Sequence, residues 1–276
     1  MTFAIEGFVP RRCSSTDRMM WITPARIFYA GLLGAPRKHT QGAIIVYVAI
    51  EAPLRVRVQG SGWQVAELVV VQPYVPFEIA CAGRHVLDIL VEPETVDFSR
   101  LPPLLRACGA VDMPDFADHV RMLHRRLVAS GSHGDLRPED FDQVFFGGPL
   151  PERKLDRRIA AVLEGIRANP SAMAAADQCA AQANLSFSRF LHLFKDQVGA
   201  PFRSVRAWKR ARSLLHYVQS DSALVHVALE IGYPDSTHFS HSIRQTYGLK
   251  PKDIIAGSRK LRIIAHGTQP SASARP

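Results

Sequence analysis

The chain has 276 residues, with 34 Lys and Arg against 25 Asp and Glu, and a formal net charge of +9 at pH 7. This length suffices for two domains, each with an ordinary hydrophobic core. We predict no membrane segment and a cytoplasmic protein, because no apolar run approaches about 18 residues. The four cysteines lack the spacing of a metal site, so we predict neither a metal nor another cofactor.

The positive charge is concentrated in the second half of the chain. Residues 1–150 hold 15 Lys and Arg against 16 Asp and Glu, whereas residues 151–276 hold 19 against 9. A near-neutral part joined to a basic part favours a polyanionic partner for the basic part. By charge alone, a solvated basic surface is the simpler interpretation.

Residues 1–102 are predicted to form strands. Apolar runs rich in Val, Ile and Tyr alternate with turn-forming clusters. These runs cover residues 22–31, 43–50, 54–58, 65–71, 77–81 and 85–91. Short strands at this spacing favour a barrel or a sandwich over a parallel sheet, and we predict a small, cupin-like β-barrel. The run at 43–50 is apolar at consecutive positions, so we expect that strand to be covered on both faces.

A small barrel can hold a ligand in its mouth, which would make this part a sensor domain. The polar and aromatic candidates for ligand contact are His39, Tyr47, Trp63 and His85. An ordinary structural role is the alternative for each of them. Glu92 and Glu94, at the end of the last strand, are predicted to lie in a solvated turn.

Residues 103–154 are predicted to be a helical linker and dimerisation region. Within residues 114–128, an apolar stripe recurs at helical spacing: Phe116, Val120, Leu123 and Leu127. This stripe could dock on the barrel within one chain or form a homodimer with a second copy. A second short helix is expected at 138–146, followed by a linker at 147–151.

Residues 155–260 contain two helix-turn-helix patterns. In the first, Asn184 stands where the backbone turns left-handed and Ser186 is placed to cap the next helix. In the second, Ser222 is placed to cap a helix that Gly232 and Pro234 end, and a polar-faced helix starts at Ser236. A long helix at 202–218 connects the two units.

The two units repeat the same order of residues about fifty positions apart, which implies two DNA-reading helices in one domain. The second unit contains Ala228, Gly232, Tyr233, Ser236, Phe239, Gly248 and Pro251. The first contains Ala180, Leu185, Ser186, Phe194, Lys195, Gly199 and Phe202. In these positions the chain resembles the AraC/XylS family of bacterial transcriptional regulators, over about residues 155–255.

The resemblance implies an all-α domain of seven helices behind the β-barrel, an α+β chain, and a double-stranded promoter or operator as partner. Two recognition helices would enter successive major grooves. The residues that would contact bases are Ser188, Leu191, His192, Ser236, Thr237, Ser240 and His241. The residues that would contact phosphates are Arg189, Lys195 and Arg244. A small-molecule effector and, for an activator, RNA polymerase are further expected partners.

The chain departs from the family pattern at three positions. Many members have Arg where His192 and His241 stand, Phe where Ile243 stands, and Ser or Thr where Lys250 stands. Arg can bind guanine through two hydrogen bonds, which neutral His cannot do. The departures therefore leave the preferred DNA sequence open.

Two other functions compete with a regulator. One is a β-barrel enzyme fused to a DNA-binding domain, which would need a convergent acid/base or metal set in residues 1–102. The other is an architectural DNA-binding protein without a sensor, which the long first part disfavours. The tail at 261–276 is predicted to be disordered.

Overall fold

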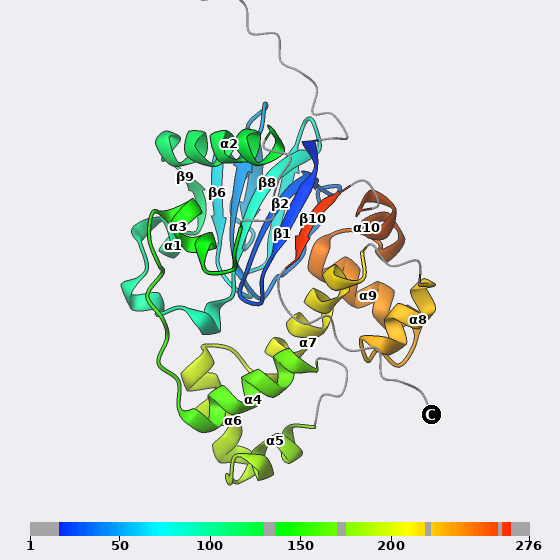
Figure 1. Ribbon diagram of the computed structural model, residues 1–276. Helices are drawn as coiled ribbons and strands as arrows, with labels where there is room; N and C mark the ends of the chain where they lie inside the picture. The colour runs from blue at the N-terminus through cyan, green and yellow to red at the C-terminus, as the bar shows by residue number, and fades with distance from the viewer. Residues whose placement is uncertain (1–16, 130–135, 170–174, 219–221, 259–260, 266–276) are drawn as a thin grey trace, which may run out of the picture.

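The computed structural model describes residues 17–129, 136–169, 175–218, 222–258 and 261–265. Two sheets and three helices form the N-terminal part of the chain, and the C-terminal part is helical (Figure 1). The fold class is therefore α+β, as predicted. The long helix α7 (Phe202–Ser213) runs from the lower group of helices toward the sheet and the second group (Figure 1).

The larger sheet has seven strands in the order β10-β1-β2-β8-β3-β6-β9. Its strands are β1 (Met19–Ile22), β2 (Arg26–Leu32), β3 (Ile44–Ala49), β6 (Leu68–Val71), β8 (His85–Val91), β9 (Gly109–Val111) and β10 (Arg262–Ala265). All neighbouring pairs are antiparallel except β1 and β10, which are parallel. The sheet is open, with β10 and β9 at its edges.

The predicted closed barrel is wrong, because the strands divide between two sheets. The second sheet consists of β5 (Gln64–Ala66), β4 (Leu54–Val58) and β7 (Phe77–Cys81), in that order. The single strand predicted at 65–71 breaks at Glu67: β5 pairs in the small sheet and β6 in the large one. The small sheet thus covers one face of the large sheet and does not continue it into a ring.

The central strand β3 shows how both faces of the large sheet are covered. All six of its residues are buried, as predicted for the run at 43–50. Because successive side chains point to opposite faces, Ile44 and Val46 join one hydrophobic cluster, and Ile45 and Tyr47 join another. The first cluster includes residues of the helices; the second includes Phe77 of the small sheet and residues from the C-terminal part.

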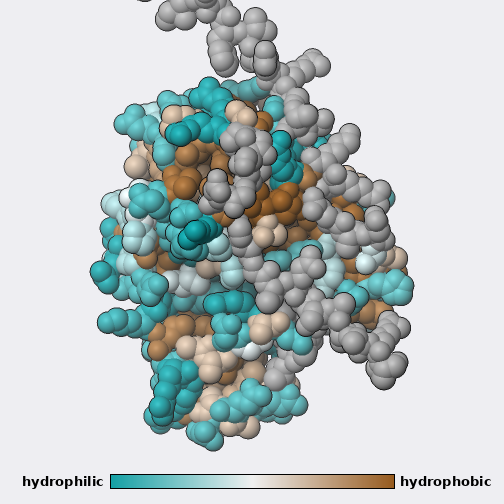
Figure 2. All heavy atoms as spheres, viewed as in Figure 1, coloured by the Kyte–Doolittle hydropathy of each residue, from teal (hydrophilic) through white to brown (hydrophobic). Residues whose placement is uncertain are grey.

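Helices cover the first face of the sheet. They are α1 (Pro103–Arg106), α2 (Pro114–Ala129) and α3 (Asp140–Phe146), and two 3-10 turns precede them, η2 (Pro93–Thr95) and η3 (Phe98–Arg100). Val120 of α2 is fully buried, and the other stripe residues, Phe116, Leu123 and Leu127, pack against the same cluster. Figure 2 shows hydrophobic residues gathered on this side of the molecule, just below the position of α2. The predicted stripe is therefore used within one chain.

From residue 157 to residue 258, the described part of the chain contains seven α-helices, the predicted number, and the 3-10 turn η4 (Leu214–His216). Besides α7, they are α4 (Arg157–Ala168), α5 (Ala176–Gln182), α6 (Phe187–Val198), α8 (Leu224–Glu230), α9 (Ser236–Tyr247) and α10 (Pro251–Ser258). Two separate hydrophobic clusters divide them: α4, α5, α6 and the start of α7 share one, while the end of α7 shares the other with α8, α9 and α10.

Part of the tail that was predicted to be disordered is a strand. Arg262–Ala265 pairs with β1 in parallel, with Met19 opposite Arg262 and Ile22 opposite Ala265 (Figure 1). An edge strand offers unpaired backbone groups, and Ile264 adds a buried side chain to the sheet. Residues 266–276 lie outside the described residues.

Candidate nucleic-acid interface and interdomain cavity

The first helix-turn-helix unit consists of α5, a short turn and α6. Asn184 lies in the turn with φ 52°, the left-handed conformation predicted for it. The backbone N–H of Leu185 donates to the carbonyl of Ala180 at 2.9 Å, which satisfies one of the free carbonyl groups at the end of α5. The Ser186 hydroxyl accepts from the Arg189 N–H at 3.4 Å, so Ser186 caps α6 as predicted.

The second unit, α8 and α9, repeats this geometry with a different cap. Gly232 has φ 87°, and the Tyr233 N–H donates to the Ala228 carbonyl at 2.9 Å. Asp235, and not Ser236, is the N-cap of α9: its Oδ1 accepts from the N–H groups of Thr237 and His238 at 2.8 Å each. Ser222 caps nothing, since the N-cap position of α8 is Ala223.

The N-caps observed in the structure show which residues of the two units correspond. Ser186 and Asp235 are 49 positions apart, one fewer than the starts predicted from sequence. In this register His192 matches His241 and Lys195 matches Arg244. Gly199 and Gly248 both end their helices with a positive φ, 83° and 68°. The two units are thus the same local structure built twice.

Each second helix buries an aromatic face and turns a polar face to solvent. Phe190 and Phe194 of α6 are fully buried, and Phe202 packs edge-on against both rings. In α9, Phe239 and Ile243 are fully buried, with Tyr233 edge-on to Phe239 at 5.3 Å. This burial fixes which side of each helix stays free.

The residues predicted to contact DNA lie on the free sides of α6 and α9. The exposed ones are Ser188, Arg189, His192, Lys195, Ser236, Thr237 and His241. Leu191, Ser240 and Arg244 are half-buried. The sequence reasoning missed His238, which is exposed and whose Nδ1 lies 2.7 Å from Oδ2 of Asp235. Its position three residues after an N-cap Asp is the signal that could have found it.

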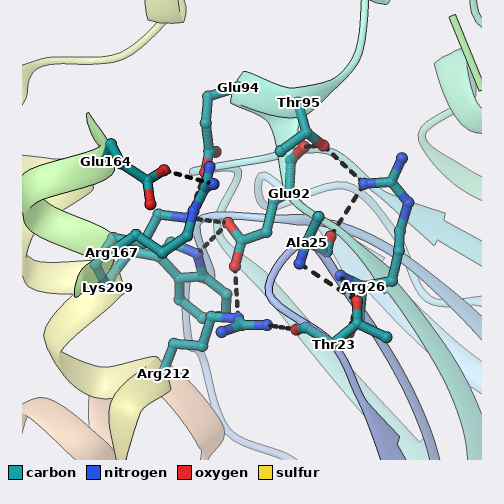
Figure 3. A network of polar contacts seen from close by, with 11 residues as sticks. Thr23, Ala25, Arg26, Glu92, Glu94, Thr95, Glu164, Arg167, Lys209 and Arg212 are labelled. Carbon is teal, nitrogen blue, oxygen red and sulfur yellow. Dashed lines mark hydrogen bonds and ion pairs between the residues drawn. The ribbon is translucent and has the colours of Figure 1, made fainter. Parts of the chain in front are cut away.

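A buried polar network joins α7 to the N-terminal part (Figure 3). Nζ of Lys209 lies 2.8 Å from Oε2 of Glu92 and also contacts Glu94, while Nε of Arg212 lies 2.7 Å from Oε1 of Glu92. The indole N–H of Trp208 donates to Oε2 of Glu92 at 2.9 Å. Glu92 is 0% and Glu94 5% exposed, so the predicted solvated turn is wrong.

Further polar contacts connect this network to the start of β2 and to α3. Arg212 donates to the carbonyl of Thr23 at 2.6 Å (Figure 3). Arg26 binds both oxygens of Asp142 in α3. Burial alone would raise the pKa of Glu94, but the ammonium group of Lys209 holds it below its ordinary value. Both carboxylates are therefore neutralised by side chains of α7, a helix of the basic domain.

The docking of α7 also depends on a glycine. A Cβ atom added to Gly42 would lie 2.3 Å from Cγ and 2.7 Å from Cβ of Trp208. Only a residue without a side chain lets the indole lie this close to the sheet. Trp208 consequently packs in the second hydrophobic cluster, among residues of both sheets.

A cavity of about 110 Å³ lies between the large sheet and the second helix-turn-helix unit. Its sheet side includes Tyr29, Tyr47 and Asp88, and its helical side includes Tyr247 and Ile254. Asp88 of β8 stands in register opposite Tyr29 on one neighbouring strand and Tyr47 on the other. Burial raises the pKa of Asp88 to about 8.

Of the four residues predicted to contact a ligand, two line this cavity and two do not. His39 and Tyr47 line it. Trp63 belongs to the small sheet region, where the guanidinium groups of Arg55 and Arg57 each lie 5.1 Å from its ring, and His85 bonds to the carbonyl of Gly83. The sequence reasoning missed Asp88, because a lone Asp within an apolar strand gives no signal of a cavity formed with a distant helix.

The C-terminal part of the chain is similar in sequence to known helix-turn-helix proteins. Residues 179–256 match the family model described as "Helix-turn-helix domain". InvF, an invasion protein of Salmonella typhi, is 30% identical over 71 residues, which are 25% of this chain and 33% of InvF. The HTH-type transcriptional regulator MtrA of Neisseria gonorrhoeae is 26% identical over 97 residues, 35% of this chain and 32% of MtrA. The matches thus span about a third of each curated relative.

The two-domain arrangement resembles solved structures of ToxT from Vibrio cholerae. Apo ToxT superposes with a TM-score of 0.56 at 10% identity, over 84% of this chain and 97% of ToxT. A second ToxT structure gives a TM-score of 0.54 at 8% identity, over 85% and 98%. One further structure is of ToxT with an unsaturated fatty acid bound, with a TM-score of 0.50, 7% identity and coverage of 84% and 95%. At these identities the likeness shows the fold.

Proposed function

We propose that this chain is a transcriptional regulator of the AraC/XylS family, which binds specific DNA sequences and controls transcription. The observation that carries the proposal is the pair of equivalent helices, α6 and α9, which present polar and basic side chains to solvent from one basic domain. Each would lie in a major groove, in successive turns of the duplex.

The solvent-facing residues divide into two roles. Those near the first turns of the helices, Ser188, Leu191, His192, Ser236, Thr237, Ser240 and His241, would read base edges. Arg189, Lys195 and Arg244 would contact phosphates, which hold the domain in register on the duplex without reading its sequence. His238 stands beside Thr237 at the start of α9, where it adds a further donor for a phosphate or a base edge.

The roles can be separated by titrating labelled duplexes. Mapping of bound genomic sites first supplies a specific duplex, and a scrambled duplex serves as the reference. We expect Lys195→Ala to weaken binding to both and to reduce the slope of log K against log salt by about 1. We expect Ser240→Ala or His241→Ala to change the ratio of the two affinities by about tenfold. Arg100→Ala, an exposed site on η3, is the control.

Equal losses on specific and scrambled DNA for both kinds of variant would reject the assigned roles. The absence of any salt-dependent binding to duplex DNA would reject the proposal as a whole, because phosphate contacts release counterions.

The cavity between the sheet and the second unit supports an effector role for the N-terminal part. The cavity touches Tyr247, the last residue of α9, and Ile254 of α10. A small molecule bound there would contact the end of a recognition helix. Its affinity for the protein would therefore differ between two positions of that helix. The ToxT structure with a bound fatty acid shows that a protein of this fold can carry a small ligand.

Other partners belong to the same proposal. An activator would also contact RNA polymerase, and a DNA-binding regulator works in the cytoplasm at the nucleoid. A homodimer through α2 would have to use its outer face, where Met122 is 41% exposed, because the apolar stripe is buried on the sheet. In the described part of the chain no helix is long and apolar enough to cross a membrane.

An enzyme fused to a DNA-binding domain remains the rival function. The acidic pair nearest to a catalytic arrangement, Glu92 and Glu94, is consumed in the ion pairs with Lys209 and Arg212. The carboxylates therefore hold two domains together, and this favours the regulator.

A further inference from the structure

The cavity of the proposed effector site contains an acidic group without a partner. Among the described residues, Asp88 forms no hydrogen bond or ion pair, although its neighbours do. The hydroxyl of Tyr29 donates to the carbonyl of Leu32 at 3.2 Å, and the amide of Gln41 donates to the hydroxyl of Tyr47 at 3.4 Å. The carboxyl group of Asp88 is half-buried, lines the cavity and is therefore available to a ligand.

The ionisable groups that line the cavity can supply negative charge but no positive charge. Its lining contains a second carboxylate, Asp253 of α10, and no Lys or Arg from the described part of the chain. The remaining titratable lining groups are neutral: the three tyrosines and His39, whose pKa burial lowers. A carboxylate ligand would meet two acids and no Lys or Arg of the lining. An ammonium ligand would instead favour the ionised form of Asp88, whose pKa burial raises in the empty cavity.

The aromatic residues of the lining suit a positive charge. Tyr29, Tyr47 and Tyr247 approach the cavity from two strands and from the end of α9. Electron-rich ring faces attract ammonium groups, and an acid beside them adds a charge-assisted hydrogen bond. The rest of the lining is largely aliphatic, with Met20, Ile45 and Ile254 among it, so the body of the ligand would be apolar.

We propose that the effector is a small hydrophobic amine, whose ammonium group pairs with Asp88 among the three tyrosines while its apolar part fills the cavity. The cavity measures about 110 Å³, less than the apolar cavity of about 150 Å³ that is known to bind benzene, so its size limits the ligand to about a single ring. The inference rests on the proposed effector role of this cavity and gives it a chemical class that differs from a fatty acid.

Three probes of similar size but different charge test whether the effector is an amine: benzylamine, benzyl alcohol and benzoate. Each is titrated into the full-length protein at pH 7 by calorimetry. We expect benzylamine to bind at least about tenfold more tightly than benzyl alcohol, equivalent to about 1.4 kcal/mol, and benzoate to bind most weakly. Asp88→Asn should remove the preference for benzylamine while leaving the affinity for benzyl alcohol nearly unchanged. Asp115→Asn, an exposed acid on α2, is the matched control and should keep the preference.

The retained binding of benzyl alcohol shows that the Asn variant is folded and its cavity intact. Tighter binding of benzoate or benzyl alcohol than of benzylamine would overturn the amine class and keep the effector site. An unchanged preference in Asp88→Asn would overturn the role of Asp88. Failure of all three probes at millimolar concentration would overturn both the class and the cavity as effector site; DNA binding, measured with duplexes alone, would be unaffected.

Discussion

Glu92 and Lys209 form a buried ion pair of 2.8 Å between residues that are 117 positions apart in the chain. Glu92 follows the last residue of a central strand, and Lys209 lies in the middle of the helix that connects the two helix-turn-helix units. Trp208 donates to the same carboxylate oxygen. The contact fixes the basic domain against the sheet, so changes at the sheet can reach α7 directly.

Removing one partner of this pair should destabilise the protein strongly. Lys209→Met leaves the buried Glu92 and Glu94 without their ammonium partner, and we expect a loss of about 3–5 kcal/mol in the free energy of unfolding. Arg203→Met, an exposed cation on the same helix, should change it by less than about 0.5 kcal/mol. Urea titration of both variants measures the difference. Similar values for the two would show that the buried pair does not hold α7.

Gly42 provides a second test of the same docking surface. Gly42→Ala places a methyl group against Cβ and Cγ of Trp208, atoms close to the helix backbone that cannot move aside. We expect a loss of about 1–3 kcal/mol in the free energy of unfolding. Gly62→Ala is the control, because nothing lies within 4 Å of a Cβ atom there. Unfolding curves that coincide for the two variants would contradict the close approach.

The pKa of Asp88 predicts a pH dependence of stability. Burial raises it from 3.8 to about 8, so the folded state binds a proton that the unfolded state releases. Asp88 therefore lowers the free energy of unfolding as pH rises from about 3.8 to 8. Asp88→Asn removes this loss and should be more stable than wild type by up to about 4 kcal/mol at pH 7, with little difference near pH 4. Asp253→Asn, which changes an exposed carboxylate, is the control variant.

The N-caps of the two recognition helices should differ in importance. Asp235 accepts two backbone N–H groups at 2.8 Å, whereas Ser186 accepts one at 3.4 Å. We expect Asp235→Ala to lower the melting temperature and the affinity for a specific duplex more than Ser186→Ala does. The effect of Asp235 should also fade in acid, because its hydrogen bonds to the backbone and ring of His238 hold its pKa below the ordinary value. The opposite ranking of the variants would contradict the observed caps.

The parallel strand β10 should protect the edge of the large sheet. A chain that ends at residue 258 lacks β10 and leaves the backbone groups of β1 unpaired. We expect it to unfold at a lower temperature and to self-associate, as measured by sedimentation, since open edges pair with other chains. A chain that ends at residue 265 retains β10 and is the control. Monomeric behaviour of both would show that β1 needs no cover.

In the helical domain, most of the structure follows from residues that are close together in the sequence. Helix ends depend on nearby positions: Asn184 and Gly232 turn the chain, Ser186 caps, and aromatic residues at spacings of four select the buried face. Such signals act within one or two turns, so the sequence predicted both units and their solvent-facing residues. The predicted start of α9 at Ser236 is confirmed, but Asp235 was not identified as its cap, because Asp and Ser are equally favoured at an N-cap.

Only the tertiary structure decided the features that join distant segments. No local pattern distinguishes a run that stays in one sheet from the run at 65–71, which changes sheets, or shows that Arg262–Ala265 returns to β1. Glu92 and Glu94 resemble any solvated turn until Lys209 and Arg212 are placed against them. Asp88 likewise resembles an interruption of a strand. Its role depends on a cavity that forms when α9 and α10 pack on the sheet, because long-range packing determines which polar groups line a cavity.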